Sequence, residues 1–352
     1  MAETMLAAVF HGPGDVSAEE VPQPRPSAGH DVLIRVTDAA VCGSDLWTYR
    51  GQGRARPGDR IGHEFAGEVI AIGSEVRWLR VGDWVIAPFR YSDGTCPHCA
   101  AGLPSSCPSG GLWGREVLDA GQGQFVRAPF ADATLVKALP TGEAPPAVLA
   151  PHLLTLADVL PTGYHAAHQA RVGPGSVVAV VGDGAVGLCA VLAAGLLGAE
   201  RVIAFGAHPD RLALAKRFGA ETTSLLRGDD AVSLVREATA GLGADQVIEA
   251  VGTAASFDSA VAMARPGGTV SYVGLPHGVQ LDLARLFPTN VTITGGIAPA
   301  RRYLPELLPL VLDGRVLPGE VFTATVPLTQ IEEAYRLMDQ REAVKVLIDP
   351  TA

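Results

Sequence analysis

Charged residues are scarce in this sequence, and neither sign of charge forms a long block. Of 352 residues, 27 are Lys or Arg and 37 are Asp or Glu, so charged residues make up only 18% of the chain and the formal net charge is −10. A chain without a basic patch has little attraction for phosphate backbones or anionic lipid surfaces. We therefore expect neither nucleic acid nor a membrane as partner, and expect a small molecule instead.

Long apolar runs are also missing. The most apolar stretch, residues 188–197, is interrupted by Gly195 and is too short to span a bilayer. The N-terminus does not combine a basic segment, a long apolar run and a small-residue cleavage site, as a secretory signal does. We expect a soluble, cytoplasmic protein.

Cysteine is rare as well. The chain has five cysteines, an odd and small number that argues against a disulfide framework.

Glycine and proline, by contrast, are frequent. The 41 Gly and 26 Pro residues exclude a helical bundle or a coiled coil, and the length favours two domains of roughly 150 to 200 residues each. With 48% hydrophobic residues the chain can form sizeable cores.

The pattern of apolar runs changes near residue 150. Before it, short runs, mostly rich in Val and Ile, separated by Gly, Pro and Asp, predict a β-rich domain. From Val177 onward, strand-like apolar runs alternate with helical stretches, which predicts an α/β domain of βαβ units with a doubly wound parallel sheet. Near the C-terminus, a helix with Ile331, Ala334, Tyr335 and Met338 on one face precedes the strand-like AVKVLIDP.

A glycine-rich loop follows the first of these alternating runs. In VVAVVGDGAVG, three glycines have the G-x-G-x-x-G spacing of a dinucleotide-binding loop between a strand and a helix. The glycines permit a tight turn, the approach of a pyrophosphate and close helix packing, and the helix N-terminus attracts the phosphates. The predicted cofactor-binding residues of this loop are Gly182, Gly184, Ala185, Val186 and Gly187.

The end of the next predicted strand bears on the choice of cofactor. An acidic residue there would accept hydrogen bonds from the ribose 2′-OH of NAD, but Gly206 occupies that position. Gly206 and Ala207 leave no carboxylate to repel a 2′-phosphate, while His208 and Arg211 offer cationic or hydrogen-bonding partners. The sequence favours NADP over NAD. In the alternative interpretation, Gly206 marks only a turn and Arg211 is a solvated helix residue.

One group of candidate metal ligands is scattered along the chain. It comprises Cys42 in VCGSD, His63 and Glu64 in GHEFAGEV, and Asp158 in LADVLPTGYH. Taken singly, Cys42 is more often a buried apolar residue and His63 a core histidine. Taken together, thiolate, imidazole and carboxylate match the three protein ligands that a catalytic zinc ion needs beside an open position.

A second group is local, with the spacing Asp93-x2-Cys96-x2-Cys99-x7-Cys107. In a reducing compartment, clustered thiols indicate a metal site before a disulfide. One aspartate and three thiolates are an allowed zinc ligand set. Three loop thiols without a metal are the alternative.

These motifs together resemble the zinc-dependent alcohol dehydrogenases of the medium-chain dehydrogenase/reductase superfamily, over essentially the whole chain. The segments that carry the resemblance are HGPGDVSAEEVPQP, CGSD, GHEFAGEV, VGDWV, the cysteine cluster, VGDGAVG, VGLPHG and AVKVLIDP. The resemblance implies a GroES-like catalytic domain, residues 1–160 and 297–352, split around a Rossmann domain, residues 161–296. It further implies homodimers or homotetramers paired near NVTITGG.

The resemblance also implies roles for particular residues. A catalytic zinc ion between the domains would be bound by Cys42, His63 and Asp158, with Glu64 as a transient ligand. The second group would hold a structural zinc ion, with Asp93 in the place of the family's first cysteine, a change that weakens the site.

Other implied roles concern the reaction. The zinc ion would polarise an alcohol oxygen so that hydride passes to the nicotinamide, and Ser44 would begin the proton relay. Trp47 stands near the position of the histidine that some relatives use in that relay. Thr162 and Val273, the latter in VGLPHG, would face the nicotinamide, and Lys345 would contact the pyrophosphate unless it is an ordinary strand-edge lysine.

The substrate is left open by the sequence. Trp47, Phe89 and Trp113 could be walls of a pocket for apolar or aromatic alcohols, or could equally be core residues. The leading hypothesis is a zinc- and NADP-dependent alcohol dehydrogenase or carbonyl reductase. The alternatives are a zinc-free quinone or enoyl reductase of the same superfamily and a nucleotide-binding protein without turnover.

Overall fold

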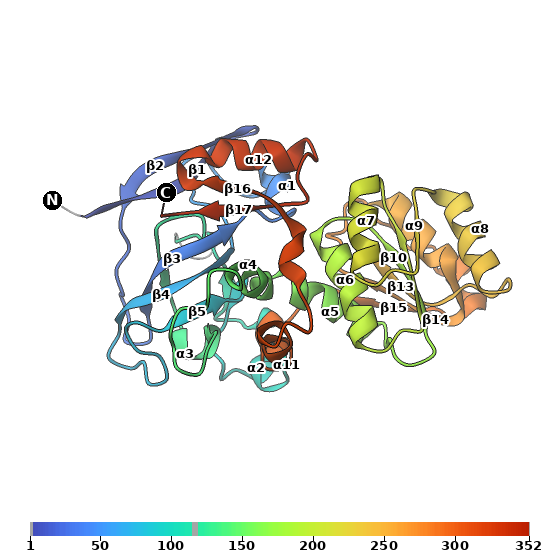
Figure 1. Ribbon diagram of the computed structural model, residues 1–352, viewed down its shortest axis with the longest axis horizontal. Helices are drawn as coiled ribbons and strands as arrows, with labels where there is room; N and C mark the ends of the chain where they lie inside the picture. Colours follow the sequence, from blue (N-terminus) through green and yellow to red (C-terminus); the bar gives the residue numbers. More distant parts are fainter. Residues whose placement is uncertain (1–2, 115–118, 352) are drawn as a thin grey trace. The chain divides into compact units, whose positions relative to one another are not determined.

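The computed structural model describes residues 3–114 and 119–351, and it divides the chain into two compact units (Figure 1). The first unit consists of residues 1–158 and 299–352, and the second of residues 159–298. These boundaries lie two residues from those expected at 160/161 and 296/297. In the described residues no helix is long and apolar enough to cross a membrane.

The first unit is built on a seven-stranded, mainly antiparallel sheet. Six strands follow the order β16-β17-β3-β4-β5-β9, and β8 also pairs with β3. Their bounds are β3 Val32–Ala40, β4 Glu64–Ile72, β5 Trp84–Ala87, β8 Phe125–Ala128, β9 Val136–Lys137, β16 Phe322–Pro327 and β17 Lys345–Asp349. Two further pairs complete the β structure, β1 Thr4–Gly12 with β2 Asp15–Pro22 and β6 Arg90–Tyr91 with β7 Gly111–Leu112.

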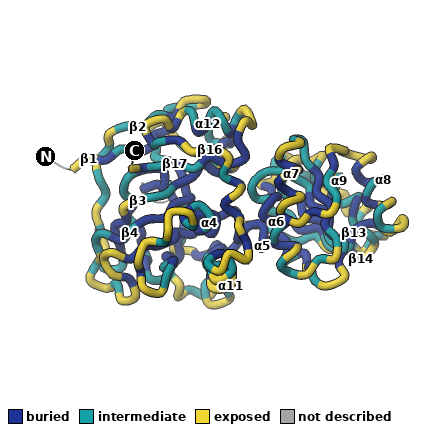
Figure 2. Tube along the Cα trace, in the orientation of Figure 1, coloured by how far each residue is buried: buried dark blue, intermediate teal, exposed yellow. Residues whose placement is uncertain are grey.

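The C-terminal segment belongs to this first unit because β17 pairs antiparallel with β3, with Leu347 opposite Ala40. The preceding helix α12, Ile331–Asp339, buries the predicted face of Ile331, Ala334, Tyr335 and Met338. That face joins the core of the first unit, which Figure 2 shows as the dark strands of its interior.

Short helices interrupt the β structure of the first unit, and the run-by-run sequence pattern did not predict them. They lie in the connections between strands, where Pro and Gly are frequent. Their bounds are α1 Asp45–Tyr49, α2 Pro97–Ala100, α3 Ala131–Thr134, α4 Ala150–Leu154 and the longer α11 Ala300–Leu312, with short 3-10 turns at Pro104–Ser106, Thr155–Ala157, Pro318–Val321 and Leu328–Gln330.

The second unit has the predicted doubly wound parallel sheet. Its strand order is β12-β11-β10-β13-β14-β15, and each adjacent pair is parallel. The strands are β10 Val177–Val181, β11 Arg201–Phe205, β12 Thr222–Ser224, β13 Ala244–Glu249, β14 Ala264–Tyr272 and β15 Thr292–Gly295. The strands on one side of β10 follow it in the order β11, β12, and those on the other side in the order β13, β14, β15, so the direction of the strand order changes at β10. Ligands of such sheets bind at the carboxyl ends of the strands where this change occurs.

Helices cover both faces of this parallel sheet, with α5 and α6 on one face and α8 and α9 on the other (Figure 1). The helices are α5 Val159–Gln169, α6 Ala185–Leu196, α7 Pro209–Arg217, α8 Gly228–Ala238, α9 Ala254–Met263 and the short α10 Leu283–Leu286, followed by a 3-10 turn at Phe287–Thr289. Helices α5 and α6 approach closely because Gly163 has no side chain: a Cβ there would lie 2.5 Å from the amide nitrogen of Ala190. Cys189 is fully buried in α6, as predicted for a core residue.

Candidate active site

Four predicted metal ligands come together in the first unit, at the ends of its central strands. Cys42 lies two residues beyond β3, His63 directly precedes β4, Glu64 is the first residue of β4, and Asp158 follows the 3-10 turn at Thr155–Ala157. The sulfur, nitrogen and oxygen atoms that these residues can offer to a metal all lie within 4.8 Å of one another. All four side chains are buried.

The closest contacts place Cys42 and His63 beside Asp158. Its Oδ2 is 3.5 Å from the Cys42 Sγ and 3.3 Å from the His63 Nε2. The hydroxyl of Ser44 donates a hydrogen bond of 3.2 Å to the same sulfur. The three predicted ligands of the catalytic metal thus converge on one point, and Ser44 lies beside them.

The backbone before His63 requires glycine. Gly62 has φ +98°, and a Cβ there would lie 2.3 Å from the Cγ of Gln122. Any side chain at this position would therefore displace Gln122 and strain the backbone that carries His63.

A second layer of polar residues, which the sequence analysis did not identify as functional, orients the ligands. Asp45 Oδ1 lies 3.1 Å from the His63 Nδ1, and Asp45 Oδ2 accepts a hydrogen bond of 3.0 Å from the Cys42 amide. Gln122 donates to Asp45, and the Tyr335 hydroxyl donates to the Gln122 Oε1 at 2.9 Å. A carboxylate on the far nitrogen fixes the orientation of a metal-binding imidazole and makes it a better ligand.

Lys345 has a partner that its predicted role did not include. Its side chain is 1% exposed, and its ammonium group donates to the Val41 carbonyl at 3.1 Å and forms a 2.7 Å ion pair with the Glu64 Oε1. The pairing of β17 with β3 brings this residue, the first of β17, to the end of β3 and to the metal group. Its contact with a pyrophosphate stays a prediction.

The residues of this group fit a bound cation. The Glu64 Oε2 is buried without a hydrogen-bond partner among the described residues. Burial, with the neighbouring Asp158 carboxylate, raises the pKa of the Cys42 thiol to about 11. Burial also raises the pKa of Glu64 despite Lys345. Closely packed acidic groups in a buried site are stabilised in their ionised form by a divalent cation.

The second cysteine group also comes together, in the loop around α2. The ligand atoms of Asp93, Cys96, Cys99 and Cys107 lie within 4.8 Å of one another, and the three thiols are free. The amides of Cys96 and Thr95 donate to the Asp93 Oδ1 and lower its pKa, whereas burial raises the pKa of the Cys99 thiol to about 12. The arrangement has the four donors of a tetrahedral zinc site.

The glycine loop of the second unit fits a phosphate group. Gly182 has φ +125°, and a Cβ on Gly187 would lie 2.0 Å from the Gly182 carbonyl oxygen. Gly184 is the N-cap residue of α6, and no side chain caps the amides of the first turn there. The space where a side chain of residue 184 would lie is open. The amides of Ala185, Val186 and Gly187 begin this helix, and such amides bind phosphate.

The residues expected to select NADP have contacts that the sequence did not suggest. Asp183, between the first two glycines, accepts hydrogen bonds from the amides of Ala207 and His208, and its Oδ2 lies 3.0 Å from the His208 Nδ1. Arg211 is only 8% exposed. The predicted 2′-phosphate partners are thus a histidine already paired with a carboxylate and a buried arginine.

The remaining predicted site residues are divided between the units. Thr162 is buried in α5, and Val273 follows β14, where its amide donates to the Glu249 carbonyl. Both belong to the second unit. In the first unit, the Phe89 ring packs edge-on against His63 at 6.3 Å between centroids, and Trp47 is half-buried on α1.

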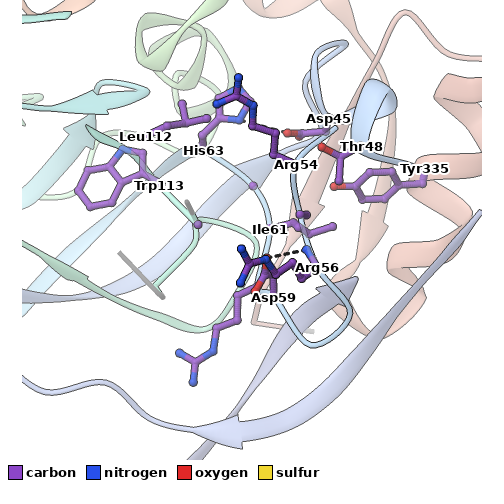
Figure 3. Close-up of a pocket in the computed structure, with 14 residues that line it drawn as sticks. Asp45, Thr48, Arg54, Arg56, Asp59, Ile61, His63, Leu112, Trp113 and Tyr335 are labelled. Carbon is purple, nitrogen blue, oxygen red and sulfur yellow. Dashed lines mark hydrogen bonds and ion pairs between the residues drawn. The ribbon is translucent and has the colours of Figure 1, made fainter. Parts of the chain in front are cut away.

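A cavity of about 390 Å³ opens beside His63 in the first unit (Figure 3). Of the three predicted wall residues only Trp113 lines it, and that ring also packs in the core against Phe65 and Tyr91. Its other lining residues are largely polar or charged, namely Asp45, Thr48, Arg54, Arg56, Asp59, Arg60 and Tyr335 among others. None of Cys42, Glu64 and Asp158 lines this cavity, so its lining does not bear on the choice of substrate.

Comparison with known proteins agrees with this geometry. Residues 28–140 match the alcohol dehydrogenase GroES-like domain, and residues 185–313 match the zinc-binding dehydrogenase domain. The chain is 36% identical to zinc-type alcohol dehydrogenase B of Aspergillus flavus, over 97% of this chain and 81% of that protein. It is 37% identical to a probable zinc-binding alcohol dehydrogenase of Mycobacterium tuberculosis, over 94% of this chain and 84% of that protein.

Among solved structures, the chain resembles an alcohol dehydrogenase of Thermus sp. ATN1. The TM-score is 0.89 at 36% sequence identity, and the match covers 98% of this chain and 99% of the other.

Proposed function

We propose a reaction for this chain from one premise: it belongs to the zinc-dependent alcohol dehydrogenases of the medium-chain dehydrogenase/reductase superfamily. The proposed reaction is the reversible transfer of a hydride between a small alcohol and a nicotinamide dinucleotide, with an aldehyde or ketone as the carbonyl partner. The observation that carries it is the buried convergence of Cys42, His63 and Asp158 beside the Glu64 Oε2, which has no hydrogen-bond partner in the part of the chain that the structure describes.

The chain's own residues would hold the metal and the cofactor. Cys42, His63 and Asp158 are the proposed permanent ligands, and Glu64 is close enough to become one transiently. When bound, zinc supplies a Lewis acid that polarises the substrate oxygen, and the nicotinamide supplies the hydride acceptor or donor. Asp45 would hold the His63 ring in place, because it binds the nitrogen that faces away from the other ligands.

Ser44 is the proposed first group of the proton path. Its hydroxyl lies 3.2 Å from the Cys42 sulfur, and the residue is solvent-exposed. A hydroxyl so placed can accept a proton from an alcohol and pass one to water. Trp47 carries no group that could continue the path, so release to water or to ribose hydroxyls is expected.

The reaction is tested by following nicotinamide absorbance with panels of alcohols, aldehydes and ketones. Cys42→Ala and Asp158→Asn should each abolish turnover, whereas Cys189→Ala, the same kind of change in the core of α6, should keep it. Undiminished turnover in both site variants would contradict the proposal. Turnover that survives complete removal of zinc would favour the zinc-free quinone or enoyl reductase instead.

Two finer points stay predictions. The first is a preference for NADP over NAD, which the sequence analysis expects from Gly206, His208 and Arg211. The second is carbonyl reductase activity, which follows from the reversibility of the reaction. A cytoplasmic location is consistent with five free cysteines, which a reducing compartment maintains.

We also propose that two copies of the chain associate through the second unit. Strand β15 pairs only with β14 among the described strands, so its other edge is open. Just before β15, Leu283 is 72% and Phe287 87% exposed. An open strand edge beside exposed apolar side chains is a ready site for pairing with a second chain. Light scattering should report a dimer or tetramer, and Phe287→Glu should lower the mass; a monomeric wild type would contradict this.

A further inference from the structure

An unpredicted carboxylate stands at the end of β11. Asp183 belongs to the glycine loop, yet its side chain reaches across to the strand end at Gly206. A Cβ on Gly206 would lie 2.5 Å from the Asp183 Cβ and 2.6 Å from its Oδ2. Asp183 therefore fills the space that a side chain at position 206 would occupy.

The carboxylate is held in place by the residues that follow Gly206. Its Oδ2 accepts hydrogen bonds of 2.7 Å from the Ala207 amide and 2.9 Å from the His208 amide, and lies 3.0 Å from the His208 Nδ1. The Oδ1 accepts no hydrogen bond from the described residues. The Asp183 side chain is 12% exposed to solvent. One oxygen is thus an anchor, and the other is available to a ligand.

The group is ionised at neutral pH. Burial raises the pKa of the Asp183 carboxyl, but the hydrogen bonds from Ala207 and His208 outweigh burial and lower the pKa below its usual value. The negative charge therefore stands at the strand end whenever a dinucleotide approaches.

This position has a defined meaning in dinucleotide-binding sheets. A carboxylate at the end of the second strand accepts hydrogen bonds from the adenosine ribose 2′-OH and repels a 2′-phosphate. In this chain the strand itself lacks that carboxylate, and the loop between Gly182 and Gly184 provides one.

We propose that Asp183 is the residue that selects the cofactor, accepting the ribose hydroxyl of NAD(H) and disfavouring the 2′-phosphate of NADP(H). This inference rests on one part of the proposed function, namely that the chain binds a nicotinamide dinucleotide. It reverses the preference for NADP expected from Gly206, His208 and Arg211, because an anion from the loop fills the space that the glycine opens. His208 pairs with that anion, and the buried Arg211 is not placed as a surface cation.

A competing interpretation gives Asp183 the opposite role. In it, the carboxylate orients the His208 ring toward the 2′-phosphate, and Asp183 then supports binding of NADP(H). The two interpretations differ in sign, so a single substitution separates them.

The test measures dissociation constants of NADH and NADPH by nucleotide fluorescence, without turnover. The wild type should bind NADH more tightly. Asp183→Asn, which keeps the shape and removes the charge, should weaken NADH binding and strengthen NADPH binding, moving the ratio of the two constants at least about tenfold, or about 1.4 kcal/mol. His208→Gln should leave the preference for NADH in place.

Asp210→Asn is the matched control, since it makes the same change on the first turn of α7. It should move the ratio less than twofold. Thermal unfolding of each variant verifies that the second unit is intact.

Three results would overturn the proposal: a wild type that prefers NADPH, an Asp183→Asn variant with an unchanged ratio, or one that loses NADPH affinity selectively. Alcohol oxidation with either nucleotide would still support the proposed function in each of these cases. Binding of neither nucleotide would overturn both.

Discussion

The buried ion pair between Lys345 and Glu64 gives a prediction whose size follows from the structure. The two side chains are 1% and 0% exposed and their charged atoms are 2.7 Å apart. Lys345→Met keeps the length of the side chain but leaves the Glu64 carboxylate buried without its cation. Breaking a buried pair from one side costs about 3 to 5 kcal/mol.

This cost should be visible in thermal unfolding of the first unit. For a unit of this size, 1 kcal/mol corresponds to about 2 to 4 °C, so Lys345→Met should lower Tm by about 6 to 20 °C. Adding Glu64→Gln should restore most of the loss, because the uncompensated charge is removed with it. In Lys345→Met, the dissociation constants of the nucleotides should change less than about threefold, because the ammonium group points toward the metal ligands. A tenfold loss of nucleotide affinity would favour the pyrophosphate contact instead.

Lys137→Met provides the matched control. The Lys137 ammonium also lies 2.8 Å from a carboxylate, that of Asp83, but its side chain is 29% exposed. Partly solvated pairs contribute about 1 kcal/mol or less, so Tm should fall by about 4 °C at most. If Lys345→Met unfolds no earlier than Lys137→Met, the reasoning about burial is wrong.

Three further predictions concern single side chains. Asp45→Asn should weaken zinc binding by about 10- to 100-fold in competition with a chromophoric chelator, because the His63 ring loses its orienting carboxylate; an unchanged affinity would remove Asp45 from the site. Asp93→Cys should make the second zinc harder to remove by chelator dialysis, since four thiolates replace three and a carboxylate; faster loss would show that the aspartate fits this loop better. Hydrogen bonds from Ser27 and Ala28 and the Arg127 guanidinium outweigh burial and lower the pKa of Asp31, so its stabilisation should be full above about pH 4 and fade as the pH falls through its folded-state pKa. The difference in unfolding free energy between wild type and Asp31→Asn should therefore shrink in acid, and a difference that grows would contradict the sign.

Features set by local spacing could be read from the sequence. Three features depend on residues that lie close together in the chain. They are the glycine loop, the alternating strands and helices of the second unit, and the group of Asp93, Cys96, Cys99 and Cys107. The three ligands of the scattered group were identified through a family resemblance, and the structure brings their donor atoms together.

Features set by pairing between distant segments could not be read in this way. The role of Lys345 depends on the register of β17 against β3, and a strand pattern does not specify which neighbour a strand takes. Tyr335 was correctly predicted as buried from its helix face, but its hydrogen bond to Gln122 joins residues 213 positions apart. The position of Asp183 depends on a glycine 23 residues later, so neither residue alone indicates the contact.

Elemental analysis of zinc per chain shows whether Cys42, His63 and Asp158 hold a zinc ion. We expect Cys42→Ala to contain one zinc ion fewer than the wild type. Cys99→Ala, in the second group, should lose a different one, so that the double variant contains neither. A folded Cys42→Ala protein with the full zinc content of the wild type would show that these three residues do not bind the metal.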